Sequence, residues 1–99
     1  MTKIVISEEA MEDIEDAWHF YDKQEAGIGD YFVACIRADI DGLRVSAGVH
    51  RIVYRDYHQL LSRVFPFGIF YTLAASEATV WAVLDLRRHP EWIRQRLGA

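Results

Sequence analysis

The sequence predicts an α+β fold in which an antiparallel sheet packs against an N-terminal helical hairpin. Apolar residues recur at helical spacing through the first half of the chain, whereas short β-rich runs follow one another from residue 57 onward. The 99 residues suffice for one hydrophobic core, because a second would need roughly 100 more. We therefore expect a single domain over residues 1–99, with the element order β-α-α-β-β-β-α.

A short strand and two helices account for the first half. Residues 3–6 form a β-branched run, and Ser7 follows as a predicted helix N-cap. The apolar stripe of the first helix consists of Met11, Ile14, Trp18 and Tyr21, with acidic residues largely between them. Helical spacing resumes at Ile28, so we expect a second, antiparallel helix that ends near Gly48.

Three strands and a short helix account for the second half. The β-rich runs are residues 57–65, 67–74 and 79–86. Pro66 separates the first two, and residues 75–77 have the length of a hairpin connection between the last two. An antiparallel meander is the simplest arrangement. Pro90 suits the first position of a terminal helix that docks on the sheet through Trp92, Ile93 and Leu97.

The formal charge of −4 is unevenly distributed along the chain. Residues 1–49 hold four basic and eleven acidic side chains, whereas residues 50–99 hold seven arginines and four acids. This asymmetry predicts different partners for the two halves. Arginine forms forked hydrogen bonds with carboxylate or phosphate, so the second half is the better candidate for recognition.

The cysteine content and hydropathy indicate a cytoplasmic protein. The single cysteine, Cys35, cannot form an internal disulfide, and small secreted domains usually need such bonds. We expect Cys35 to be a core residue in the apolar stripe of the second helix. The sequence has no signal-peptide pattern and no apolar run near the roughly 18 residues that cross a membrane. We therefore expect no membrane partner.

The sequence indicates no catalytic or metal site. The four histidines are scattered, and no Cys or His pair has the short spacing of a zinc site. The segment from Gly27 to Gly29 lacks the third glycine and the lysine of a phosphate-binding loop. Glu12 with Glu15 or Asp16 is best interpreted as a set of solvated carboxylates. We therefore expect no catalytic residue, no metal and no cofactor.

The C-terminal segment is the strongest candidate for a binding surface. Residues 86–97 concentrate four arginines around Trp92, and arginine and tryptophan dominate the energetics of protein interfaces. An equally weighted interpretation is a terminal helix that buries Trp92 while its arginines are simply solvated. The candidate target-binding residues are Arg63, Arg87, Arg88, Trp92, Arg94 and Arg96.

Three segments together resemble the RelE/ParE toxin superfamily. They are Leu-Leu-Ser-Arg-Val-Phe-Pro-Phe-Gly-Ile-Phe-Tyr at 60–71, Trp-Ala-Val-Leu at 81–84 and Arg-Arg-His-Pro-Glu-Trp at 87–92. The ParE-like, or plasmid-stabilisation, branch fits best, because its last strand ends in Arg-Arg-Asp-Pro followed by a tryptophan. The resemblance implies a toxin of a type II toxin–antitoxin pair, neutralised by a cognate antitoxin. We expect that antitoxin to bind an apolar groove at the helical hairpin or an edge of the sheet.

The resemblance leaves three functions open. The ParE branch implies a protein that binds DNA gyrase and traps it on cut DNA, without catalytic residues of its own. The ribonuclease branch implies cleavage of messenger RNA on the ribosome by basic residues on the middle strands. The third function is that of a decayed toxin that binds only its antitoxin.

The residues at the ribonuclease positions favour gyrase. Where that branch places basic residues, this chain has Gln59, Leu61 and Gly68, and only Arg88 matches a catalytic position. Neutral side chains cannot stabilise a pentavalent phosphate, so cleavage would need Arg63 or another arginine, such as the one at position 51, to enter the site. We therefore expect action by binding rather than catalysis.

Overall fold

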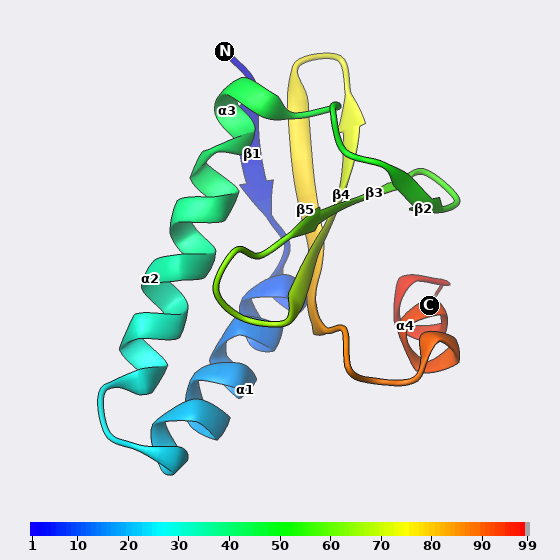
Figure 1. Cartoon of the computed structure of the whole chain (residues 1–99). Helices are drawn as coiled ribbons and strands as arrows, with labels where there is room; N and C mark the ends of the chain where they lie inside the picture. Colours follow the sequence, from blue (N-terminus) through cyan, green and yellow to red (C-terminus); the bar gives the residue numbers. More distant parts are fainter. Residues whose placement is uncertain (99) are drawn as a thin grey trace.

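The computed structural model describes residues 1–98 and contains one five-stranded sheet with helices on both faces (Figure 1). The sheet order is β1-β5-β4-β3-β2. The elements in chain order are β1 (Lys3–Ile6), α1 (Glu8–Gln24), α2 (Ile28–Asp41), α3 (Leu43–Ser46), β2 (Ile52–Tyr54), β3 (Tyr57–Leu61), β4 (Phe67–Ala74), β5 (Glu77–Asp85) and α4 (Pro90–Gly98). The predicted α+β class, the helical hairpin and the terminal helix are confirmed.

Helix α1 begins where the sequence predicts but presents a slightly different face. The Ser7 side chain accepts a hydrogen bond from the Ala10 amide at 3.1 Å, as an N-cap does. The stripe that faces the core runs through Ala10, Ile14, Ala17 and Tyr21, whereas the side chain of Met11 is 51% exposed. Ile14 and Tyr21 of the predicted stripe therefore face the core, whereas Ala10 and Ala17 take the places predicted for Met11 and Trp18.

The second helix is shorter than predicted. It ends at Asp41, and one further turn, α3, follows Gly42. Gly48 lies beyond that turn with φ of +97°, a left-handed conformation in which glycine carries no steric cost. Cys35 is only half-buried, and its neighbour Ile36 takes the fully buried position, so the expectation of a core cysteine was wrong.

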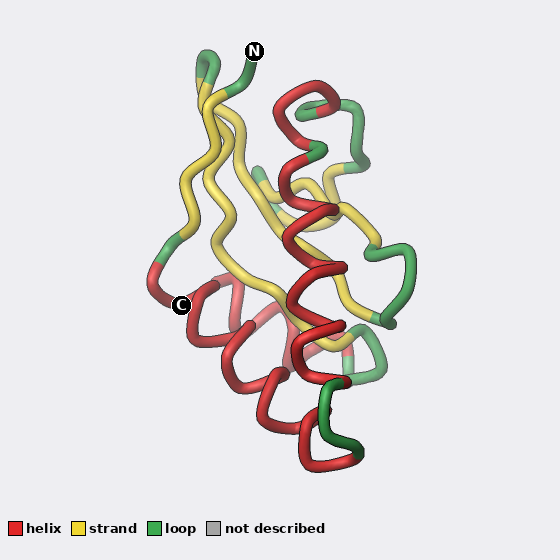
Figure 2. The backbone as a smooth tube through the Cα atoms, turned by 90° about the vertical axis from the view of Figure 1, so that its left-hand side faces the viewer, coloured by secondary structure: helices red, strands yellow, loops and turns green. Residues whose placement is uncertain are grey.

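The sheet is mixed, which corrects the prediction of an antiparallel one. β1 pairs in parallel with β5, in the register Ile4↔Ala78 and Ile6↔Val80, while the other pairs are antiparallel. The helical hairpin carries the chain back along the sheet, and the meander then brings β5 beside β1 (Figure 2). The order is β-α-α-α-β-β-β-β-α, because the three-residue strand β2 and the short α3 were missed.

Two of the three predicted strands have different boundaries in the structure, since β3 ends at Leu61 rather than at residue 65 and β5 spans Glu77–Asp85 rather than residues 79–86. β3 ends at Leu61, so residues 62–66 form a loop rather than the end of a strand. β5 begins at Glu77, which pairs with Ala74, so the connection to β4 is the two-residue turn Ala75-Ser76. Ala75 has φ of +54°, the left-handed conformation that tight hairpin turns require.

Two apolar clusters lie on opposite faces of the sheet. The larger joins the hairpin to one face and includes Phe32, Ile36, Ile69 and Tyr71, all with 0% exposure. The smaller lies under α4 and is built from the buried residues Phe70, Ala82, Leu84 and Leu97. The alternation of Ile69, Phe70 and Tyr71 along β4 thus supplies both clusters. Helix α4 thereby covers a sheet face that the hairpin does not reach (Figure 1).

Candidate functional site

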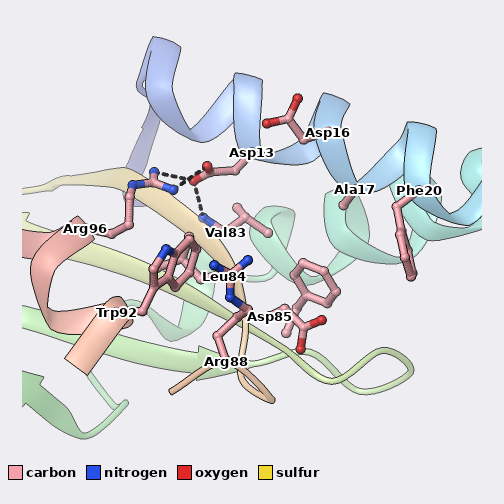
Figure 3. Close-up of a pocket in the computed structure, with 11 residues that line it drawn as sticks. Asp13, Asp16, Ala17, Phe20, Val83, Leu84, Asp85, Arg88, Trp92 and Arg96 are labelled. Carbon is pink, nitrogen blue, oxygen red and sulfur yellow. Dashed lines mark hydrogen bonds and ion pairs between the residues drawn. The ribbon is translucent and has the colours of Figure 1, made fainter. Parts of the chain in front are cut away.

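An open groove lies between α1 and α4, with β5 as its floor (Figure 3). Its volume is about 430 Å³. One wall comes from α1, and the other from α4 and the segment that follows β5. The lining residues are Asp13, Asp16, Ala17, Phe20, Phe67, Val83, Leu84, Asp85, Arg88, Trp92 and Arg96.

Asp13 fastens the two walls of the groove together. Its carboxylate accepts hydrogen bonds from Arg96 Nη1 at 2.8 Å and Nη2 at 2.9 Å, and from the Val83 backbone amide at 3.0 Å (Figure 3). β1 ends opposite Val80, so the Val83 amide lies on an uncovered strand edge and Asp13 satisfies it. The hydrogen bonds from Arg96 to Asp13 raise the pKa of that guanidinium. The pair is therefore a structural contact rather than a free binding group.

Arg88, which is exposed, and Trp92, which is half-buried, form the α4 side of the groove. The Arg88 guanidinium lies 3.9 Å from the centroid of the Trp92 ring, and that of Arg96 lies 5.9 Å from it. Within residues 1–98 Arg88 makes no ion pair, so stacking orients its guanidinium while leaving its hydrogen-bond donors free. Phe20 of α1 is 53% exposed at the opposite wall. The groove thus offers two aromatic surfaces and one oriented cation.

Arg87 is held by the strand end rather than presented to a partner. Its Nη2 donates to Asp85 Oδ2 at 2.6 Å, its Nε donates to Asp85 Oδ1 at 3.0 Å, and its backbone amide donates to the same Oδ1 at 2.9 Å. These hydrogen bonds hold the pKa of Asp85 below its ordinary value. Arg87 thereby shapes the turn that carries Arg88 into the groove.

The structure brings half of the predicted binding residues together. Arg88, Trp92 and Arg96 line the groove, and Arg87 lies directly beside it. Arg94 lies on another side of α4, 3.4 Å from Glu91. Arg63 lies apart, in the loop after β3, where its Nε is 3.5 Å from Asp39 of α2. The six residues therefore do not form one surface.

Sequence reasoning missed the α1 wall of the groove. Asp13 was one of many carboxylates in an acidic helix, and no local pattern distinguishes it from exposed Asp16. Its side chain is nevertheless 11% exposed. Phe20 lay outside the predicted apolar stripe, and the sequence gives no signal for it, because single exposed apolar residues are common on protein surfaces.

The positions at which the ribonuclease branch places basic residues are occupied by apolar packing or neutral groups. A Cβ atom at Gly68 would lie 2.9 Å from Leu86 Cδ2 and 3.0 Å from the Phe70 ring, so a larger side chain fits there only if these side chains move. Gln59 faces α4, and Leu61 is 57% exposed. Arg63 contacts the hairpin layer, whereas Arg88 stacks on α4.

A second groove lies between the two helices of the hairpin beside β1. Its volume is about 490 Å³, and most of its lining is aliphatic. Arg37 and Arg44 stand at its rim with Asp41, which accepts a hydrogen bond from Arg44 Nε at 2.7 Å. β1 is an edge strand, because β5 is its only partner in the sheet of residues 1–98. The apolar residues of this hairpin groove are Ile4, Ile6, Met11, Ile14, Val33 and Ile40.

Comparison with known proteins identifies a fold rather than a close relative. No family model matches the chain, and no curated protein matches it in sequence. A chain of the solved structure described as "Chromosomal ParDE TA system from P. aeruginosa" matches with a TM-score of 0.77. The two are 14% identical, and the match covers 84% of this chain and 94% of that one. The fold is therefore ParE-like, which confirms the expected resemblance at the level of the fold.

Within residues 1–98, no helix is both long and apolar enough to cross a membrane. No group of three or more His, Cys, Asp or Glu side chains is arranged to hold a metal ion in the described part of the chain.

Proposed function

We propose that this chain is the toxin of a type II toxin–antitoxin pair and that it stops growth by binding DNA gyrase through the α1–α4 groove. The observation that carries the proposal is the Arg88 guanidinium, stacked on Trp92 and free of any ion pair within residues 1–98. Arginine and tryptophan together are the usual composition of a protein-binding hot spot. The ParE-like fold, shared with a chain of a ParDE system, supports the toxin class.

The groove suits binding because its parts are already ordered. The Asp13–Arg96 pair sets the spacing of its walls, and the Asp85–Arg87 pair sets the turn before Arg88. Binding of a partner therefore loses little conformational entropy at these side chains, so more of the contact energy contributes to affinity. A partner that inserts an apolar side chain between Phe20 and Trp92 would also reach the donors of Arg88.

Ribosome-dependent cleavage of messenger RNA is the second candidate. Arg88 occupies a position that the ribonuclease resemblance assigns to catalysis. The neutral Gln59 and the tightly packed Gly68 count against this candidate, because a developing phosphate charge needs several cations around it. A decayed toxin that binds only its antitoxin is the third candidate.

The antitoxin binds in the hairpin groove in this proposal. Aliphatic lining favours an amphipathic segment, and the unpaired edge of β1 offers backbone hydrogen bonds to an added strand. Arg37 and Arg44 at the rim favour acidic side chains on the antitoxin. The charged residues that line this groove are Arg37, Asp41 and Arg44, and none of them lines the target-binding groove.

Pulse incorporation of labelled thymidine and methionine, shortly after induction in a bacterium without the antitoxin, tests the target. An early fall in thymidine incorporation supports gyrase, and an early fall in methionine incorporation supports the ribonuclease. Unaffected growth at high expression supports the decayed toxin.

Variants of the groove test its role directly. Purified gyrase with plasmid DNA should be inhibited by the native chain. Arg88→Ala should weaken inhibition about 30-fold, the effect of losing a hot-spot residue of about 2 kcal/mol. Arg51→Ala removes an equal charge outside both grooves and serves as the matched control. Equal inhibition by the two folded variants would remove the basis for placing the target at Arg88.

A further inference from the structure

A further pocket lies between α2 and the loop of residues 62–66, which follows β3 and reaches towards α2 (Figure 1). Its volume is about 330 Å³. Cys35, Ala38 and Asp39 of α2 line one side, and Arg63 and Val64 of the loop line the other. None of these residues lines the target-binding groove or the hairpin groove. This loop pocket is therefore a separate feature of the surface.

Asp39 places a largely buried charge in the loop pocket. Its side chain is 7% exposed, so little water reaches the carboxylate. The Arg63 Nε lies 3.5 Å from Asp39 Oδ1, beyond the roughly 2.7–3.2 Å of an N–H···O hydrogen bond. No other group in residues 1–98 pairs with the Asp39 carboxylate or donates a hydrogen bond to it. Buried carboxylates are normally paired and hydrogen-bonded, so the bonding capacity of Asp39 is largely unused.

Arg63 neutralises Asp39 without filling the loop pocket, because the volume of about 330 Å³ is open with Arg63 in this position. The Arg63 side chain is 82% exposed, and an ion pair with so exposed a partner contributes little to stability. An entering cation can therefore displace it at small cost. Val64 is 54% exposed, and Cys35 and Ala38 add apolar surface beside the carboxylate.

These features match the side chain of an arginine. Two carboxylate oxygens without hydrogen bonds can accept the paired N–H groups of one guanidinium. The methylene stem of an arginine packs on apolar surface of the kind that Ala38 and Val64 provide. A lysine ammonium lacks the forked geometry, and Asp39 would repel a phosphate. Ligand pockets measure about 300–1,000 Å³, so about 330 Å³ suits one side chain rather than a large ligand.

We propose that the loop pocket binds an arginine side chain of a partner protein, which pairs with Asp39 and displaces Arg63. Arg63 then acts as an internal competitor, because it occupies the same carboxylate until the partner binds. The proposal rests neither on gyrase nor on the antitoxin, since the residues of the loop pocket line neither groove. Its failure would therefore leave the proposed function unchanged.

Titration of the full-length chain with N-acetyl-argininamide, followed by NMR of the backbone amides, tests the proposal. The amides of Ala38, Asp39 and Val64 should shift saturably. N-acetyl-citrullinamide has nearly the same shape without the charge, so it should bind at least about tenfold more weakly. Free L-arginine should bind no more tightly than the amide, because only the side chain enters the pocket.

Three outcomes of this titration would overturn the proposal. The first is no saturable shift up to about 50 mM N-acetyl-argininamide. The second is equal binding of the citrulline derivative, because the pocket would then not recognise a cation. The third is a preference of about tenfold for free arginine, since the ligand would then be a small molecule rather than a protein side chain.

Two substitutions should change the affinity for N-acetyl-argininamide in opposite directions. Asp39→Asn keeps the size of the side chain and loses its charge, so binding should weaken at least about tenfold. Arg63→Ala removes the competitor, so binding should strengthen about two- to fivefold, because an exposed ion pair contributes up to about 1 kcal/mol.

Matched variants control for the change in net charge. Glu12→Gln and Arg51→Ala remove the same charges outside the loop pocket and should leave the affinity unchanged. Unchanged binding by folded Asp39→Asn would refute the site, and unchanged or weaker binding by folded Arg63→Ala would refute the competition. If Asp39→Asn does not fold, Arg63→Ala and the citrulline comparison still decide, because Arg63 is 82% exposed and its removal leaves the core intact.

Discussion

The Asp13–Arg96 contact should contribute more to stability than any other surface charge pair of this chain. Asp13 is 11% exposed and accepts three hydrogen bonds, two from Arg96 and one from the Val83 amide. Asp13→Ala leaves that amide without a partner, which costs about 1–3 kcal/mol. Breaking a fully buried pair costs about 3–5 kcal/mol, but Arg96 is 31% exposed and solvent compensates part of this. We therefore expect a total loss of about 2–4 kcal/mol.

Thermal and urea unfolding of matched variants measures this contribution. A loss of 2–4 kcal/mol corresponds to a fall in Tm of about 10–20 °C in a domain of this size. Asp13→Asn keeps an oxygen for the Val83 amide and loses the charge, so it should cost about half as much. Asp16→Ala, one turn further along α1, makes no ion pair within residues 1–98 and should change stability by less than about 0.5 kcal/mol. If Asp13→Ala costs no more than Asp16→Ala, the contact does not fasten α4 to α1.

Three further outcomes are expected. The Tyr71 hydroxyl lies 2.6 Å from His50 Nδ1, and burial lowers the pKa of His50. Neutral His50 should therefore stabilise the fold above pH 6.5, and this contribution should be lost as the pH falls through the lower pKa of the folded state. Urea unfolding at a series of pH values should show a flatter dependence of stability on pH for His50→Asn. Hydrogen bonds from Arg87 lower the pKa of Asp85, so ionised Asp85 stabilises the fold above the unfolded-state pKa near 3.8, and this contribution is lost as the pH falls through the lower pKa of the folded state. In Arg87→Ala, NMR titration should show a higher pKa for Asp85 than in the native chain. Gly68→Ala places a Cβ 2.9 Å from the Leu86 side chain and should cost about 1–3 kcal/mol in urea unfolding, and an unchanged midpoint would show that the packing yields.

The sequence predicted correctly those helices whose ends are marked by residues at the ends themselves. Ser7 before an acidic first turn predicted the start of α1, and Pro90 predicted the start of α4. β2 was missed because three residues are too few to show alternation. The parallel pairing of β1 was missed because the residues of a strand do not indicate which other strand it pairs with, and the partner of β1 lies more than 70 positions away.

Some residues of the candidate site could likewise be predicted from the sequence, and others could not. The arginine-rich segment around Trp92 was visible as a concentration of residue types, and the structure places three of its members in one groove. Asp13 could not be selected from the sequence, because its role depends on the edge of β5 left open where β1 ends. Arg63 was included for its residue type alone and lies in the loop beside α2, paired with Asp39. Composition thus identified the segment, and only the packing distinguishes its members.

The contact between Asp13 and Arg96 joins residues separated by 83 positions, which has a consequence for synthesis of the chain. Contacts of such long sequence separation form late, because loop closure must precede them. The α1 wall leaves the ribosome early, but the opposite wall emerges only with residues 88–96. A nascent chain therefore has no target-binding groove. The residues that line the hairpin groove all lie at or before Arg44, but two of them belong to β1, which is held in place by β5. The surface proposed for the antitoxin is thus complete once β5 has formed, before the α4 wall of the surface proposed for the target.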